Sequence, residues 1–150
     1  MRLWNELPLD IRNSTSLSIF KSKLHNHGYY SNICPEWYSS GDRYASILHT
    51  RLRLGSSQLN SHLFKIGVKS NSSCACGAKN EDAWHFFFQC PFYTVLRSNL
   101  HTIVSKFAPI SLQTVLYGSF SCTLLENVQI FAGVQHYVMS SARISKTGIG

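Results

Sequence analysis

Apolar residues recur at spacings of three and four along most of the chain, which is the pattern of amphipathic helices. Residues that favour helix ends flank these segments: Asp42 precedes one as an N-cap and Gly55 ends it, while Gly67 and Pro109 end two others. The pattern predicts helices over about residues 15–25, 43–54, 57–66, 81–88, 91–107 and 124–140.

The same pattern predicts which side chains face the core. In the helix after Asp42 we expect an apolar stripe of Tyr44, Ile47, Leu48 and Leu52, with His49, Arg51 and Arg53 largely outside it. In the helix after Asn80, its expected N-cap, the aromatic run of Trp84, Phe86, Phe87 and Phe88 is apolar on all sides and predicts a buried element. The polar end of the chain is expected to be frayed.

These elements predict a mainly α fold with little or no β. Residues 1–41 are rich in turn signals, residues 42–108 hold the central helices, and residues 109–150 hold one further helix and the polar end. A chain of 150 residues, 44% of them hydrophobic, is long enough to bury a core.

Composition narrows the class of partner. The chain has 14 Lys and Arg against 7 Asp and Glu, for a formal net charge of +7. Such a surplus favours an anionic partner, most often nucleic acid, although it can also serve solubility alone. The N-terminal residues lack the apolar stretch of a secretion signal, and no apolar run approaches the ~20 residues of a membrane span. We therefore expect an intracellular protein of the nucleus or cytoplasm that is neither secreted nor bound to a membrane.

The cysteines carry the clearest chemical signal. Their number, five, is odd, which argues against a secreted disulfide framework. Cys74, Cys76, His85 and Cys90 have the spacing Cys-x-Cys-x8-His-x4-Cys. Three thiolates and one imidazole form a tetrahedral set for zinc, with no coordination position left for a substrate. The sequence thus predicts one structural Zn²⁺ ion in an irregular knuckle loop of a zinc-stapled helical domain, with Gly77 allowing a tight turn.

Other interpretations of these residues stay open. The four side chains can also be read as ordinary core residues, since free cysteine is often buried. His49 is an alternative ligand, and Cys34 and Cys122 are expected to be plain buried residues.

A longer pattern surrounds the zinc motif. It runs as His-x-Arg-x-Arg-x-Gly, Cys-x-Cys-Gly, an acidic residue, His, bulky apolar residues, Cys-Pro and a later Arg. In this chain these positions are His49, Arg51, Arg53, Gly55, Cys74, Cys76, Gly77, Glu81, His85, Cys90, Pro91 and Arg97. The pattern resembles the zinc-binding region that follows the reverse transcriptase in non-LTR (LINE-type) retrotransposon polyproteins. Residues 3–26 also resemble the Trp-Asn-x-Leu-Pro…Phe-Lys segment near the carboxyl end of such polymerases. The likeness is specific over residues 3–26 and 43–107 and weaker over 112–143.

The resemblance implies a domain organisation and a function. Residues 1–41 would be a remnant of the polymerase-adjacent segment, 42–108 the zinc-binding domain, and 109–150 a C-terminal helix and tail. The module would bind RNA or DNA, without sequence preference, and hold it for a reverse transcriptase domain. That domain would have been lost from the same chain or would act in trans. The three aspartates of this chain are not paired, so we expect neither polymerase nor endonuclease activity, and no small-molecule substrate.

The expected phosphate contacts are Arg51, Arg53, Lys65, Lys69, Lys79 and Arg97. Trp84, Tyr38 or Tyr93 would stack on bases, or else pack in the core, which we favour for Trp84. One alternative is a structural element that docks on another protein through Trp4, Leu7, Ile11 and Phe20. Another is a decayed retroelement fragment with no independent activity.

Overall fold

The computed structural model describes residues 9–16, 19 and 35–144. The chain divides into two compact units, Met1–Pro35 and Glu36–Gly150. In the first unit the described residues include helix α2 (Leu9–Arg12). The helix expected at about residues 15–25 lies almost entirely outside the described residues. Cys34 and the side chains of the expected docking set Trp4, Leu7, Ile11 and Phe20 lie outside them as well.

The second unit is helical. Its elements are η1 (Glu36–Ser39), α5 (Arg43–Arg53), α6 (Asn60–Lys65), η2 (His85–Gln89), η3 (Pro91–Tyr93), α7 (Thr94–Val104), α8 (Leu112–Tyr117) and α9 (Leu124–Ser141). No strand occurs among the described residues, so the prediction of a mainly α fold is confirmed. The expected segments 42–108 and 109–150 both fall within this unit. In the part of the chain that is described, no helix has both the length and the apolarity needed to cross a membrane.

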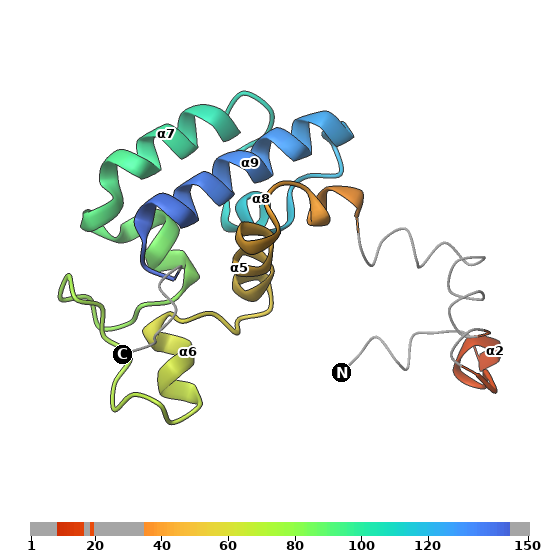
Figure 1. Ribbon diagram of the computed structural model, residues 1–150, viewed down its shortest axis with the longest axis horizontal. Coiled ribbons are helices and arrows are strands. Elements are labelled where there is room, and N and C mark those ends of the chain that lie inside the picture. Colours follow the sequence, from red (N-terminus) through yellow and green to blue (C-terminus); the bar gives the residue numbers. More distant parts are fainter. Residues whose placement is uncertain (1–8, 17–18, 20–34, 145–150) are drawn as a thin grey trace. The chain divides into compact units, whose positions relative to one another are not determined.

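Helix α9 is the central element of the second unit. It contacts α5, α7, α8 and η1, and Figure 1 shows it in blue beside α7 and across α5. A capping box begins the helix, in which Thr123 and Glu126 bond to each other's backbone N–H groups. A Cβ on Gly133 would lie 3.1 Å from Cγ2 of Ile103, so α9 approaches α7 closely at this glycine.

The core is formed where these helices meet. It includes Leu48, Leu52, Phe86, Phe87, Leu100, Val104, Val115, Ile130, Phe131, Val134, Tyr137 and Val138. Each large apolar side chain that leaves water contributes about 1.5–3 kcal/mol to folding. The α7–α9 layer therefore supplies much of the apolar burial that supports the segments beside it.

Helix α5 begins where the sequence predicts. The carboxylate of Asp42 accepts hydrogen bonds from the N–H groups of Tyr44 and Ala45, at 2.9 and 3.1 Å. The predicted apolar stripe is partly wrong, because Tyr44 and Ile47 are exposed to 37% and 41% of their surface. The buried face is Ala45, Leu48, His49 and Leu52. Helical periodicity is compatible with the predicted stripe and with the observed buried face. The contacts of α5 with α8 and α9 determine which of the two faces is buried.

The interior position of His49 corrects its expected place outside the stripe. Its ring is fully buried, lies 4.3 Å from the ring of Phe131, and pairs through Nε2 with the carbonyl of Val115 at 2.9 Å. Burial, reinforced by the positive charge of Arg53, lowers the pKa of His49 to about 3, so the ring is neutral.

Three further expectations need correction. Asp82, not Asn80, accepts the capping hydrogen bond, from the N–H of His85 at 2.8 Å. Trp84 is 48% exposed, and its ring stacks on Phe88 at the rim of the core, while Phe86 and Phe87 are buried as expected. The end of the chain, expected to be frayed, is packed as far as Ile144, which is only 2% exposed, and the residue before it, Arg143, pairs with Glu81; residues 145–150 lie outside the described residues.

Candidate metal centre

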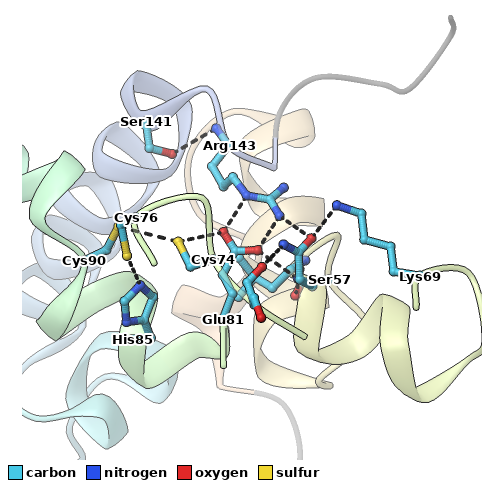
Figure 2. A network of polar contacts seen from close by, with 12 residues as sticks. Ser57, Lys69, Cys74, Cys76, Glu81, His85, Cys90, Ser141 and Arg143 are labelled. Carbon is cyan, nitrogen blue, oxygen red and sulfur yellow. Dashed lines mark hydrogen bonds and ion pairs between the residues drawn. The ribbon is translucent and has the colours of Figure 1, made fainter. Parts of the chain in front are cut away.

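Four side chains from two separate segments of the chain come together in one cluster. The ligand atoms of Cys74, Cys76, His85 and Cys90 all lie within 4.8 Å of one another, close enough to hold a metal ion. Cys74 Sγ is 3.9 Å from Cys90 Sγ, and Cys76 Sγ is 3.3 Å from Nε2 of His85. Figure 2 shows the three sulfur atoms and the imidazole directed toward one another. The set is the one that the spacing predicts.

The first pair of ligands is carried by a tight turn. The N–H of Gly77 donates to the carbonyl of Cys74 at 3.0 Å, and the N–H of Cys74 donates to the carbonyl of Ala78 at 2.9 Å. Gly77 has a φ of +96°, in a region that only glycine enters readily. A Cβ at this position would meet nothing within 4 Å, so the glycine is required by the backbone conformation and not by lack of space. This turn makes the one-residue gap between the two cysteines workable.

The second pair is carried by η2, a single π-helical turn. The N–H of Cys90 donates to the carbonyl of His85, five residues earlier, at 2.8 Å. Residues five apart do not share a face of an α-helix, but the wider π turn brings them back to the same side. The spacing His-x4-Cys is therefore compatible with one site because of this turn, which the sequence pattern does not reveal.

Two long side chains hold the π turn in place. Nε of Arg97 donates to the carbonyl of Phe87 at 2.9 Å, and its Nη2 donates to the carbonyl of Cys90. The hydroxyl of Tyr137, in α9, donates to the carbonyl of Phe86 at 2.5 Å. These donors satisfy carbonyl groups near a break in the regular helical pattern.

The buried carboxylate of Glu81 lies beside Cys74 and joins several polar groups around it. Glu81 is 2% exposed, and its Oε1 lies 3.6 Å from Sγ of Cys74. Its Oε2 accepts from the N–H of Asn60 at 2.9 Å, at the start of α6. Arg143, beyond the end of α9, donates Nε to Oε1 at 2.7 Å and pairs through Nη2 with Oε2. Burial acts to raise the pKa of Glu81, but the hydrogen bonds from Arg143 and Asn60 prevail and lower it, so the carboxyl is ionised.

The three thiols of the cluster differ in acidity. Burial raises the pKa of Cys74 to about 12 and also raises the pKa of Cys90. Hydrogen bonding to the backbone of Ala78 lowers the pKa of Cys76. A cation that binds here must therefore displace protons from sulfur, which makes its affinity dependent on pH.

The expected phosphate contacts fall into two groups. Arg51, Lys65, Lys69 and Lys79 are exposed, and Nζ of Lys69 donates to Oδ1 of Asn60 at 2.8 Å. Arg53 is half-buried, with its guanidinium 4.3 Å from the ring centre of Tyr38 and bonded to Oγ1 of Thr50 at 2.7 Å. Arg97 is half-buried as well and is engaged with the π turn.

The remaining candidates lie outside the cluster. Cys122 is half-buried and donates to the carbonyl of Phe107 at 3.3 Å, and His49 is paired with Val115. The rings of Tyr38 and Tyr93 pack against Phe131 and Phe86 respectively. Sequence reasoning did not identify the partners of the centre, Arg143, Asn60 and Tyr137. No signal links them to it, because Arg143 lies 62 positions from Glu81.

Comparison of the chain with protein-family models, with curated proteins and with solved structures gave no match.

Proposed function

We propose that the chain is a zinc-binding module that binds RNA or DNA without sequence preference and has no catalytic role. The observation that carries the proposal is the cluster of three sulfurs and one imidazole nitrogen within 4.8 Å. Soft thiolates with imidazole select zinc over hard cations such as magnesium or calcium. Four protein ligands leave no position for a substrate, so the ion has a structural role.

The distances support zinc. Bond lengths of about 2.3 Å to sulfur and about 2.0 Å to nitrogen place tetrahedral ligands about 3.8 Å apart for two sulfurs and about 3.5 Å apart for sulfur and nitrogen. The corresponding distances are 3.9 Å for Cys74 and Cys90, and 3.3 Å for Cys76 and His85. The widest separation in the set, within 4.8 Å, exceeds these values by about 1 Å, so a zinc ion would draw the ligands closer together.

Metal analysis of the purified chain tests the zinc site. We expect one zinc ion per chain, and loss of helical circular dichroism when a chelator removes it, because metal binding supplies folding energy. Cys76→Ser should abolish both effects. Cys122→Ser is the matched control, since that thiol lies outside the cluster, and it should leave both unchanged. A folded wild-type chain without zinc would overturn the proposal.

Exposed cations support the nucleic-acid part of the proposal. The net charge of +7 and the exposed Arg51, Lys65, Lys69 and Lys79 suit contacts with phosphates. The resemblance to the region that follows LINE-type reverse transcriptases points in the same direction. On this proposal the module works inside the cell beside a reverse transcriptase domain, in cis or in trans.

Salt-dependent binding to a labelled single-stranded RNA tests this part. Each lost phosphate contact should reduce the slope of log affinity against log salt by about 0.7. We expect this reduction for Lys65→Ala and for Lys79→Ala. Lys106→Ala, which removes an exposed lysine outside the expected set, should leave the slope unchanged. The same titration with single-stranded DNA compares the two nucleic acids.

Exposed apolar side chains favour one other function. Phe64, Ile66 and Val68 are exposed to 50%, 56% and 66% of their surface around the end of α6, as a protein-docking element would require. Apolar docking depends weakly on salt, in contrast to phosphate binding. Capture of a partner whose affinity is insensitive to salt, with no affinity for RNA or DNA, would favour docking over the proposed function.

A further inference from the structure

Arg143 lies far from the metal ligands in the chain and close to them in the fold. It follows Ala142, which ends α9 in a left-handed conformation with a φ of +50°. The N–H of Arg143 donates to Oγ of Ser141 at 3.3 Å, and the next residue, Ile144, is buried. The backbone at Arg143 is therefore fixed on both sides of the residue. Figure 2 shows the guanidinium directed at Glu81, on the side of Cys74 away from His85.

The pairing of Arg143 with Glu81 is a two-pronged one. Nε donates to Oε1 at 2.7 Å, and Nη2 pairs with Oε2, while the side chains are exposed to only 23% and 3%. Nη2 also donates to Oδ1 of Asn60 at 3.0 Å. A bidentate guanidinium–carboxylate pair fixes direction as well as charge, and it is stronger when shielded from water.

Glu81 passes this constraint to the metal site. Its Oε1, which accepts from Arg143, is also the oxygen 3.6 Å from Sγ of Cys74. The backbone N–H of Glu81 donates to the carbonyl of Ser72 at 2.8 Å, in the segment that leads into the turn of Cys74 and Cys76. Asn60 contacts the same segment, since its Nδ2 donates to the carbonyl of Ser73 at 2.5 Å. Both partners of Arg143 thus hold the segment that presents Cys74.

The positive charge of Arg143 also offsets negative charge at the metal site. Three thiolates around a divalent cation leave a surplus of one negative charge, and Glu81 adds another beside Cys74. Carboxylate and thiolate at this distance repel each other in a buried setting unless a cation lies next to them. Arg143 supplies that cation.

We propose that Arg143 is a positioning residue for the metal site, acting through Glu81 on Cys74. The inference rests on the metal-binding part of the proposed function and is independent of nucleic-acid binding. Partners of this kind, one step removed from the metal, typically change metal affinity by 10- to 100-fold when they are replaced.

Metal competition with the full-length chain tests this inference. Affinity for Zn²⁺ is measured against a chelator, and Co²⁺ reports the ligand set by its absorption spectrum. We expect Arg143→Ala to weaken the affinity by about tenfold or more and to alter the Co²⁺ bands. Arg143→Lys keeps the positive charge but cannot form the bidentate pair with Glu81, so it should recover part of the lost metal affinity. Arg143→Ala combined with Glu81→Ala should cost less affinity than the sum of the two single losses, because Arg143 acts on the site through Glu81.

Two control variants separate positioning from charge and from general stability. Arg43→Ala removes an exposed positive charge, and Val134→Ala weakens the apolar core of α9. Both should retain the wild-type Co²⁺ spectrum, and Val134→Ala sets the affinity loss that destabilisation alone produces. The inference is overturned if Arg143→Ala retains wild-type affinity and spectrum, or loses no more affinity than Val134→Ala at matched stability. A wild-type chain that binds neither Zn²⁺ nor Co²⁺ would overturn the proposed zinc site together with it.

Discussion

His49 is a buried histidine whose protonation links folding to pH. Its pKa is about 3 in the folded chain, against an ordinary value of 6.5, because burial and Arg53 both disfavour the charged ring. Below pH 6.5 the unfolded chain binds a proton that the folded chain does not. The contribution to stability is therefore complete above pH 6.5 and is lost as the pH falls toward 3.

Urea unfolding of metal-loaded wild type and His49→Phe at several pH values checks this linkage. The free energy of unfolding of wild type should fall, relative to that of the variant, by at most about 1.4 kcal/mol per pH unit below pH 6.5. The metal ligands titrate in both proteins, so their contribution cancels in the comparison. Equal pH dependence of the two proteins would show that His49 is not the titrating group.

Gly77→Ala isolates the backbone requirement of the cysteine turn. The φ of +96° costs an alanine roughly 1–2 kcal/mol, and this strain should weaken metal affinity because the turn presents Cys74 and Cys76. Gly55→Ala is the matched control, with a φ of +67° and equally open surroundings, but outside the ligand segments. It should lower stability and leave metal affinity unchanged. Chelator competition and thermal unfolding of both variants decide the matter, and equal metal affinities would refute the requirement.

At the scale of elements, η2 is the segment on which the second ligand pair depends. A π turn is less favourable than a regular α-helical turn, and here it is held by Arg97 and Tyr137 from two different helices. The aromatic residues within it, Phe86 and Phe87, are buried and keep the turn against α9. His85 and Cys90 thus take their positions from a segment whose conformation is imposed by tertiary packing.

Arg97→Ala should show that this arginine supports the turn. It removes two hydrogen bonds with a charged donor, each worth about 1.5–3 kcal/mol, so both stability and metal affinity should fall. The slope of RNA affinity against salt, measured on metal-loaded protein, should stay unchanged, since the guanidinium is engaged with the carbonyls of Phe87 and Cys90. A reduced slope with unaltered metal affinity would instead assign Arg97 to phosphate binding.

At the scale of the whole second unit, α9 joins the metal centre to the core. The middle of α9 packs in the core through Ile130, Phe131 and Val134. Nearer its end, Tyr137 bonds to the π turn, and Arg143, just beyond the helix, pairs with Glu81. Binding of a metal and folding of residues 36–144 are therefore expected to be coupled.

Thermal unfolding at increasing free zinc concentration checks this coupling. A ligand that binds only the folded state stabilises it by about 2.7 kcal/mol at 100 times its Kd, so the Tm of the helical signal should rise with zinc. Cys76→Ser should abolish the rise. Val138→Ala, a core substitution in α9, should lower the Tm at every concentration and keep the rise. A zinc-independent Tm in a chain that binds zinc would mean that the centre is not coupled to the helices.

The helical class, the N-cap at Asp42 and the four members of the cysteine–histidine cluster followed from the sequence by itself. Helical periodicity, capping and ligand spacing are properties of residues close together in the chain, so local pattern is sufficient for them. Tertiary structure alone decided that α5 buries His49 and exposes Ile47, that a π turn joins His85 to Cys90, and that Arg143 meets Glu81. Each of these depends on partners many positions away, whose contacts are selected by the packing of α9 and leave no trace in local spacing.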